Sequence, residues 1–184
     1  MLGHFLLRNT PEGIAGGAIV ETEAYLKDDS ACHSFSGESA RNRSMFGPPG
    51  HAYVYLIYGY HFCVNAVCQP AGCAEAVLIR AASVDFNEKW MLAQRPVKKR
   101  EQLTNGPAKL CEALAIDRAL DAVDLCDGSS PLFIAENPDR ANLLLKSGPI
   151  VAAPRIGITK AADLELRFYL RSSPFVSRRN RPAT

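Results

Sequence analysis

Two aromatic and β-branched runs follow each other in the first half of the chain and meet at Tyr58-Gly59-Tyr60. The runs, residues 51–60 and 61–68, are rich in Tyr, Val, Ile and Phe, which favour strands. Gly47-Pro48-Pro49-Gly50 turns the chain just before them. The pattern predicts a β-hairpin with its tip at residues 58–60, and therefore a fold built on a sheet.

Further strands and helices are predicted on both sides of this hairpin. Residues 18–26 alternate, so that Ile19, Glu21, Glu23 and Tyr25 share one strand face. The other predicted strands are residues 76–82, 150–158 and 164–170, and the predicted helices are residues 85–94, residues 108–114 behind Pro107, and a short one, capped by residues 28–30, that ends at His33. A length of 184 residues suits one ordinary domain. We therefore expect residues 1–184 to form a single α+β domain on a curved antiparallel or mixed sheet.

Composition excludes several classes of protein. Hydrophobic residues make up 47% of the chain and charged residues 22%, as in globular proteins. No apolar stretch approaches the roughly 20 residues of a membrane span, so no membrane is expected as a partner. The N-terminus carries no visible export signal, which predicts a protein that is not secreted and whose six cysteines stay reduced.

The charge distribution is compatible with nucleic acid but does not demand it. The net charge is only +2, yet basic residues gather in three clusters: Arg41 with Arg43, residues 95–100, and Arg178, Arg179 and Arg181. Such clusters suit a track for phosphates, and they also suit ordinary solvated faces.

No cofactor motif and no nucleophile triad is legible. The GxxxxGK[ST] and GxGxxG motifs, zinc-ligand spacings and a Ser/His/Asp arrangement are all absent. Cys63, Cys68 and Cys73 are evenly spaced, but they include no CxxC pair, and the first two fall on opposite faces of one predicted strand. We expect neither a metal nor a cofactor, which leaves cofactor-free hydrolysis or plain binding.

Two carboxylates on one strand are the first candidates for chemistry. Glu21 and Glu23 are two residues apart, so they lie roughly 7 Å apart along a strand. A carboxylate at the edge of a pocket can activate water or stabilise an oxocarbenium-like transition state. On pattern alone, two exposed strand charges are the more ordinary interpretation.

Other candidates are aromatic or polar residues in unusual places. Tyr58 is expected at the hairpin tip, where a core aromatic has little to pack against and a wedge between stacked bases is possible. Asn65 and Arg80 stand inside apolar strands, so burial would demand hydrogen-bond partners for both. His33 alone is more often structural than catalytic.

A series of short motifs, each present once, extends in order along almost the whole chain. They are residues 16–26 with Glu21-Thr22-Glu23-Ala24-Tyr25, His33-Ser34, residues 41–46, Pro49-Gly50, residues 53–59, Phe62-Cys63, Asn65, and residues 77–81, 106–111, 155–157 and 167–169. Together they resemble the alkyladenine (3-methyladenine) DNA glycosylase family. The resemblance implies an α+β enzyme with a curved antiparallel sheet, like the C-terminal domain of methionyl-tRNA formyltransferase.

The resemblance also implies roles for the residues of a base pocket. Glu23 is similar to the family's water-activating base. Tyr25, His33 and Tyr55 resemble the walls that contact a flipped base, and Asn65 resembles the residue that excludes the exocyclic amino group of guanine. The implied reaction is hydrolysis of the N-glycosidic bond of alkylated or deaminated purines, which leaves an abasic site.

Further implied roles concern the DNA itself. Tyr58 resembles the wedge that fills the gap in the duplex, and Arg80 resembles a residue at the catalytic water or the target phosphate. Arg41, Arg43 and Lys109 are possible contacts to the DNA backbone. The expected partner is double-stranded DNA with a damaged purine, and we expect a monomer without an obligate protein partner, cytoplasmic (in a bacterial nucleoid) or nuclear.

Some residues depart from the family pattern or limit its chemistry. Tyr60 and His61 stand where larger relatives favour other apolar or aromatic residues, and Glu38 is unfavourable for a phosphate contact. Lys27, the lysine nearest to Glu23, lies past the end of the predicted strand. It is a poor Schiff-base nucleophile there, so we expect a monofunctional hydrolase.

Two other functions are compatible with the pattern. A nucleic-acid-binding module on the same fold would not need Glu23, Tyr25 and Asn65 together. A hydrolase of free nucleosides would not need a wedge at Tyr58 or basic clusters.

Overall fold

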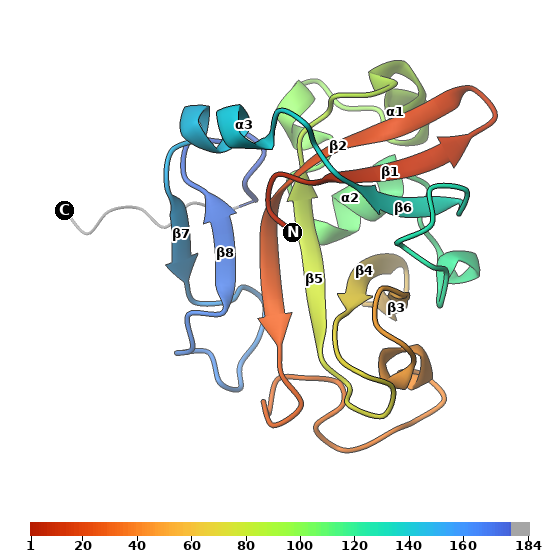
Figure 1. Cartoon of the computed structure of the whole chain (residues 1–184), viewed down its shortest axis with the longest axis vertical. Coiled ribbons are helices and arrows are strands. Elements are labelled where there is room, and N and C mark those ends of the chain that lie inside the picture. Colours follow the sequence, from red (N-terminus) through yellow and green to blue (C-terminus); the bar gives the residue numbers. More distant parts are fainter. Residues whose placement is uncertain (178–184) are drawn as a thin grey trace.

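The computed structural model describes residues 1–177, which fold as an α+β structure around one curled antiparallel sheet (Figure 1). Its strands are β1 (Phe5–Thr10), β2 (Gly13–Tyr25), β3 (Ala52–Ile57), β4 (His61–Val67), β5 (Ala76–Ala82), β6 (Leu132–Ala135), β7 (Ile150–Ala153) and β8 (Arg167–Leu170). Its α-helices are α1 (Glu88–Gln94), α2 (Pro107–Ala113) and α3 (Arg140–Lys146). Short 3-10 helices cover Arg43–Phe46, Arg100–Gln102 and Arg118–Leu120.

The long strand β2 organises the sheet. Its first half pairs with β1, and its second half lies between β5 and β8, so that the strand order is β3-β4-β5-β2-β1-β6 with β7-β8 on the other side of β2. In Figure 1, β2 crosses the molecule beside β1 and then turns down alongside β5. Gly17 allows β2 to lie close to the backbone of Ser83 at this bend, because a Cβ at residue 17 would be 2.0 Å from the carbonyl oxygen of Ser83.

The register between β2 and β5 is irregular where the candidate carboxylates lie. Glu21 pairs with Ala81 and Thr22 pairs with Ile79, so the ladder skips Arg80 on β5, and it also skips Val20 on β2. A β-bulge redirects side chains and often lies beside a functional site. The bulged region carries Glu21 and Arg80 to the same place.

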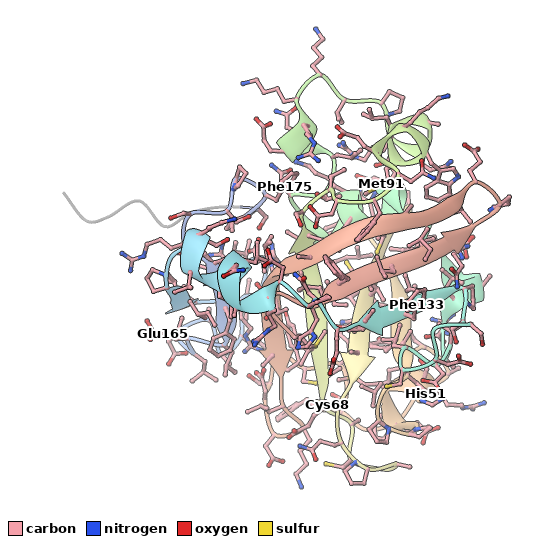
Figure 2. All side chains as sticks on the ribbon, turned by 45° about the horizontal axis from the view of Figure 1, so that its top comes forward. His51, Cys68, Met91, Phe133, Glu165 and Phe175 are labelled. Carbon is pink, nitrogen blue, oxygen red and sulfur yellow. The ribbon has the colours of Figure 1, made fainter. Side chains whose placement is uncertain are left out.

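The main core lies between the sheet and the helices α1 and α2. Its fully buried members include Leu6, Ile19, Ile79, Met91 and Leu110. Met91 and Phe175 lie at the helical end of the molecule, and Cys68 and His51 lie at the opposite end (Figure 2). A second cluster of buried residues, around Tyr53 and Tyr55, lines the candidate site described below.

Several sequence predictions are confirmed. The hairpin forms with residues 58–60 between β3 and β4, the strand of residues 76–82 is β5, and Pro107 is the first residue of α2. The sheet is antiparallel in every pairing within residues 1–177. Its likeness to the formyltransferase domain, and a single domain over residues 1–184, stay predictions.

The predicted short helix ending at His33 is wrong. Residues 26–37 form turns, because the carboxylate of Asp29 accepts the N–H of Ala31 at 2.9 Å and pairs with Arg155. An Asp side chain that bonds backbone two residues ahead makes a turn in place of a helix cap.

The helix predicted over residues 85–94 begins three residues later. Asp85 accepts the N–H of Ala18 at 2.9 Å, and Phe86 pairs with Gly16, so these residues extend the sheet. Asn87, with a positive φ of 48°, then caps α1 by accepting the N–H of Trp90.

The two late strands are shorter than predicted, and two strands were missed. Pro154 removes a ladder donor after β7, and two residues later the N–H of Ile156 donates to the Glu23 carboxylate. β1 and β6 lack a clear alternating pattern, and the predicted strand of residues 18–26 begins at Gly13. Among residues 1–177 no helix is both long and apolar enough to cross a membrane.

Candidate active site

A cavity of about 380 Å³ opens between β2, the β3–β4 hairpin and β5. Apolar and polar side chains both line it, with several tyrosines beside charged groups. The lining residues that carry the argument are Glu23, Tyr25, His33, Tyr55, Tyr58, Asn65 and Arg80. All seven are residues that the sequence singled out, and the fold brings them together from four segments.

Glu23 is fully buried at the wall of this cavity. Its Oε1 accepts the backbone N–H of Ile156 at 2.7 Å and lies 3.2 Å from Nη1 of Arg80. Its Oε2 accepts the Tyr25 hydroxyl at 2.9 Å. A buried carboxylate needs such partners, and here they also fix its orientation toward the cavity.

Glu21 is also fully buried, so the interpretation of both glutamates as exposed strand charges is wrong. Its Oε1 accepts Nε of Arg80 at 3.1 Å, Nε of Arg167 at 2.7 Å and the Ser177 hydroxyl at 2.9 Å. Its Oε2 accepts the N–H of Ser177 at 2.7 Å. Glu21 does not line the cavity, and these four bonds make it a structural anchor for its neighbours.

Arg80 joins the two carboxylates. Its Nε faces Glu21, its Nη1 faces Glu23, and its Nη2 donates to the Ser177 hydroxyl at 3.3 Å. Burial lowers the pKa of this guanidinium, but the carboxylates of Glu23 and Glu21 outweigh that effect and the net direction is upward. Arg80 and Arg167 balance the charges of the two glutamates, which is what allows four ionic groups to be buried together.

The Tyr25 ring is held on both its hydroxyl and one face. Burial first, and then the Glu23 carboxylate that accepts its hydroxyl, raise the pKa of Tyr25 far above its usual value, so it remains a donor. The guanidinium carbon of Arg155 lies 4.6 Å from the ring centroid.

His33, Tyr53 and Tyr55 form an aromatic wall. The rings of Tyr53 and Tyr55 stack at a centroid distance of 5.3 Å, and the His33 ring meets Tyr55 edge-on at 4.6 Å. Nδ1 of His33 is 2.8 Å from the Tyr53 hydroxyl. Burial, and then the charge of Arg41, lower the pKa of His33, so the imidazole favours its neutral form.

Asn65 and Cys63 come from β4 and complete the floor. Nδ2 of Asn65 donates to the carbonyl of Tyr53 at 3.0 Å, which fixes the amide in the buried strand. Cys63 is paired with Tyr55 across the hairpin, and burial raises the pKa of its thiol. A buried thiol of this kind packs as a small apolar group.

Tyr58 reaches the mouth of the cavity from the hairpin tip. The residue is 73% exposed, and its backbone has a positive φ of 54° before Gly59 at 81°. Tyr60, on the other side of Gly59, is 71% exposed, and its ring contacts that of His61. The expectation of a tip aromatic without a core to join is confirmed.

The basic residues predicted to contact the DNA backbone lie outside the cavity lining. The Arg41 guanidinium is 5.6 Å from the Tyr55 ring centroid, and Lys109 follows the lining residue Ala108 and donates to Asn105. Arg43 is exposed and pairs with Glu38 at 3.3 Å. In the 95–100 cluster, the ion pairs are Arg95 with Glu112 and Arg100 with Glu88. Arg178, Arg179 and Arg181 lie outside the described residues.

Sequence reasoning missed the partners that hold the site. Arg155, Ile156 and Arg167 were noted only as parts of motifs, although one stacks on Tyr25, one donates to Glu23 and one pairs with Glu21. A charged residue inside an apolar late strand, as at Arg167, was the available signal. Among residues 1–177 no group of three or more His, Cys, Asp or Glu side chains could hold a metal ion.

Comparison with known proteins gives a match along most of the chain. The model of the methylpurine-DNA glycosylase family matches residues 1–174. A protein of Rhizobium meliloti is 49% identical over 164 residues, covering 89% of this chain and 82% of the relative. A protein of Methanoculleus marisnigri is 48% identical over 174 residues, covering 95% and 88% respectively. Both relatives carry the name "Putative 3-methyladenine DNA glycosylase".

Proposed function

The chain belongs to the methylpurine-DNA glycosylase family, enzymes of DNA repair that hydrolyse N-glycosyl bonds, and on that premise we propose how its site works. The enzyme flips alkylated or deaminated purines, of the 3-methyladenine, 7-methylguanine and hypoxanthine class, out of duplex DNA. Glu23 activates the water that replaces the base, and an abasic site remains. The observation that carries this proposal is a buried, oriented carboxylate in a cavity walled by tyrosines.

In the hydrolytic step, Glu23 is the base that activates the attacking water. Water bound at the carboxylate attacks C1′ of the sugar and gives up a proton to Glu23, while the bond from C1′ to the purine nitrogen breaks. A purine alkylated at N3 or N7 is a cation, so it takes the bonding electrons and leaves as a neutral molecule. A neutral purine such as hypoxanthine takes the same electrons as an anion and is neutralised by a proton from water or from a protein acid. Tyr25 and the Ile156 N–H keep the carboxylate aimed during this step.

Arg80 belongs to this step and not to phosphate binding. Its nitrogens face Glu21, Glu23 and Ser177, and its side chain is buried. A phosphate would have to displace these carboxylates. We therefore assign Arg80 to holding Glu23 and the attacking water.

The pocket walls suit a cationic or electron-poor purine. A cation against a tyrosine face gains about 0.5–2 kcal/mol, and Tyr25 and Tyr55 supply such faces in the cavity. A neutral His33 adds no positive charge that would repel the cation. The Asn65 amide occupies the floor, where it would crowd the 2-amino group of guanine. 7-Methylguanine carries the same group, but its positive charge weakens its glycosidic bond and favours the tyrosine faces, which offsets this cost.

The exposed tip supports base flipping. A base in a duplex cannot reach a buried carboxylate unless it leaves the stack, at a cost of a few kcal/mol. We assign Tyr58 to filling the gap, and Arg41, Arg43 and Lys109 are the proposed contacts to the DNA backbone. Exposed pairs such as Arg43–Glu38 are weak, so a phosphate can replace the carboxylate. A monomer without an obligate protein partner, acting on chromosomal DNA, is part of the same proposal.

Base release from defined duplexes tests the proposal. The purified protein is incubated with duplexes that carry 7-methylguanine or hypoxanthine, and abasic sites are cleaved with alkali and resolved on a gel. Strand cleavage at the lesion position only after alkali treatment is the expected result. Cleavage without alkali would contradict the monofunctional mechanism, and release from free nucleosides alone would contradict action on duplex DNA.

A further inference from the structure

A buried cation lies behind the Tyr25 ring. The Arg155 guanidinium carbon is 4.6 Å from the ring centroid, and the Arg155 side chain is fully buried. Tyr25 lines the cavity, whereas Arg155 is not among its lining residues. The cation therefore covers the side of the ring away from the cavity, and the opposite face remains available for a purine.

Asp29 neutralises this cation. Nη1 of Arg155 donates to the Asp29 carboxylate, which is buried with it. Nη1 also donates to the carbonyl of Ala24 at 3.0 Å, and Nη2 donates to the carbonyl of Ala161 at 3.3 Å. The ring is thus backed by an ion pair with no net charge, fixed to the end of β2.

The charge behind the ring matters to a cationic purine and not to a neutral one. The 4.6 Å from guanidinium to ring centroid and a stacking distance of about 3.5 Å separate the two charges by about 8 Å. Two unit charges at that separation, with an effective dielectric constant of about 20–40, change an affinity by about 5- to 30-fold. Asp29 removes this penalty as long as it remains ionised beside Arg155.

We propose that the Asp29–Arg155 pair sets the preference of the pocket for cationic over neutral purines by fixing the charge behind Tyr25. Both residues are specificity-determining, and they act through Tyr25 without touching the purine. The inference rests on the proposed function, since it assumes that the purine stacks on Tyr25.

The test is a ratio of binding affinities measured with Glu23→Gln, which prevents turnover. Duplexes with 7-methylguanine, a cation, and with hypoxanthine, a neutral base, are titrated against each variant. Asp29→Asn leaves Arg155 uncompensated and should lower the preference for 7-methylguanine by about 5- to 30-fold. Arg155→Gln leaves the Asp29 carboxylate uncompensated and should raise the preference for 7-methylguanine. The double variant should return the ratio to within about threefold of the starting value, because the pair is neutral again.

If the inference is correct, the two single variants shift the affinity ratio in opposite directions. A merely structural role predicts that both variants weaken both duplexes by the same factor, and that result would overturn the inference. Arg155→Met also removes the charge and replaces Arg155→Gln if the latter fails to fold. Arg155→Lys keeps the charge and should keep the ratio, which makes it the matched control. Failure of the proposed function looks different, because the unmodified enzyme would then release neither base.

Discussion

Tyr58→Ala distinguishes a wedge from a packing residue by its effect on stability. Since Tyr58 is 73% exposed, it buries on the order of 50 Å² of the roughly 200 Å² of a tyrosine. At roughly 25 cal/mol per Å², truncation costs about 1 kcal/mol, against about 3–5 kcal/mol for a core aromatic. For a protein of this size, 1 kcal/mol lowers Tm by about 2–4 °C.

The same substitution should have a larger effect on duplex DNA. Without the ring, the flipped state loses about the stacking energy of one base, roughly 1–3 kcal/mol, so lesion binding weakens about ten- to hundredfold. Fluorescence anisotropy with a lesion duplex and with the same lesion in single-stranded DNA measures this. The loss should shrink in the single strand, where no stack has to be opened.

The hairpin tip offers a matched control. Tyr60 is 71% exposed on the other side of Gly59, and Tyr60→Ala should weaken binding less than Tyr58→Ala. Tyr58→Phe should bind as the wild type does, because the wedge needs the ring and not the hydroxyl. A Tm drop of about 10 °C or more for Tyr58→Ala, with unchanged affinity per folded molecule, would refute the wedge.

Three further predictions concern the active site and the contacts to the DNA backbone. Glu23→Gln should bind lesion duplexes but release base at least about 100-fold more slowly in single turnover. Similar base release by Glu23→Gln and wild type would contradict the assignment of Glu23 as the base. The control, Glu21→Gln, deprives Arg167 and Arg80 of a buried partner and should lower the free energy of unfolding by about 3–5 kcal/mol, measured by thermal denaturation. Asn65→Ala should admit guanine from undamaged duplex and release it. If the variant excises lesions but leaves guanine in the DNA, Asn65 is not the residue that excludes guanine. Log affinity for DNA should fall linearly with log salt, by about 0.9 per neutralised phosphate, and an affinity that does not change with salt would contradict a phosphate track.

The sequence predicts best what local patterns control. The β3–β4 hairpin and β5 follow from runs of strand-forming residues with a glycine turn between them, and Pro107 marks the start of α2. These signals work because they depend on neighbours within a few residues. The grouping of the cavity residues came from the family resemblance and not from periodicity.

What the sequence could not predict depends on distant partners. Strand alternation makes Glu21 an exposed charge unless Arg167 and Ser177 are known to lie against it. The predicted helix at residues 28–33 fails for the same reason, since Arg155 takes the Asp29 carboxylate that would have capped it. The bulge that brings Arg80 to both glutamates is a property of two strands and has no signature in either one.

The hydrogen bonds of Glu21 and Glu23 also determine when the site can exist during protein synthesis. Both glutamates leave the ribosome early, on the second strand, whereas Arg80 follows 59 residues after Glu21, Ile156 follows 133 residues after Glu23, and Ser177 follows 156 residues after Glu21. Contacts over such separations form late, because a long loop must close before they stabilise anything. A nascent chain therefore carries its glutamates without the groups that orient them, and it gains a working site only when residues near 177 have been made.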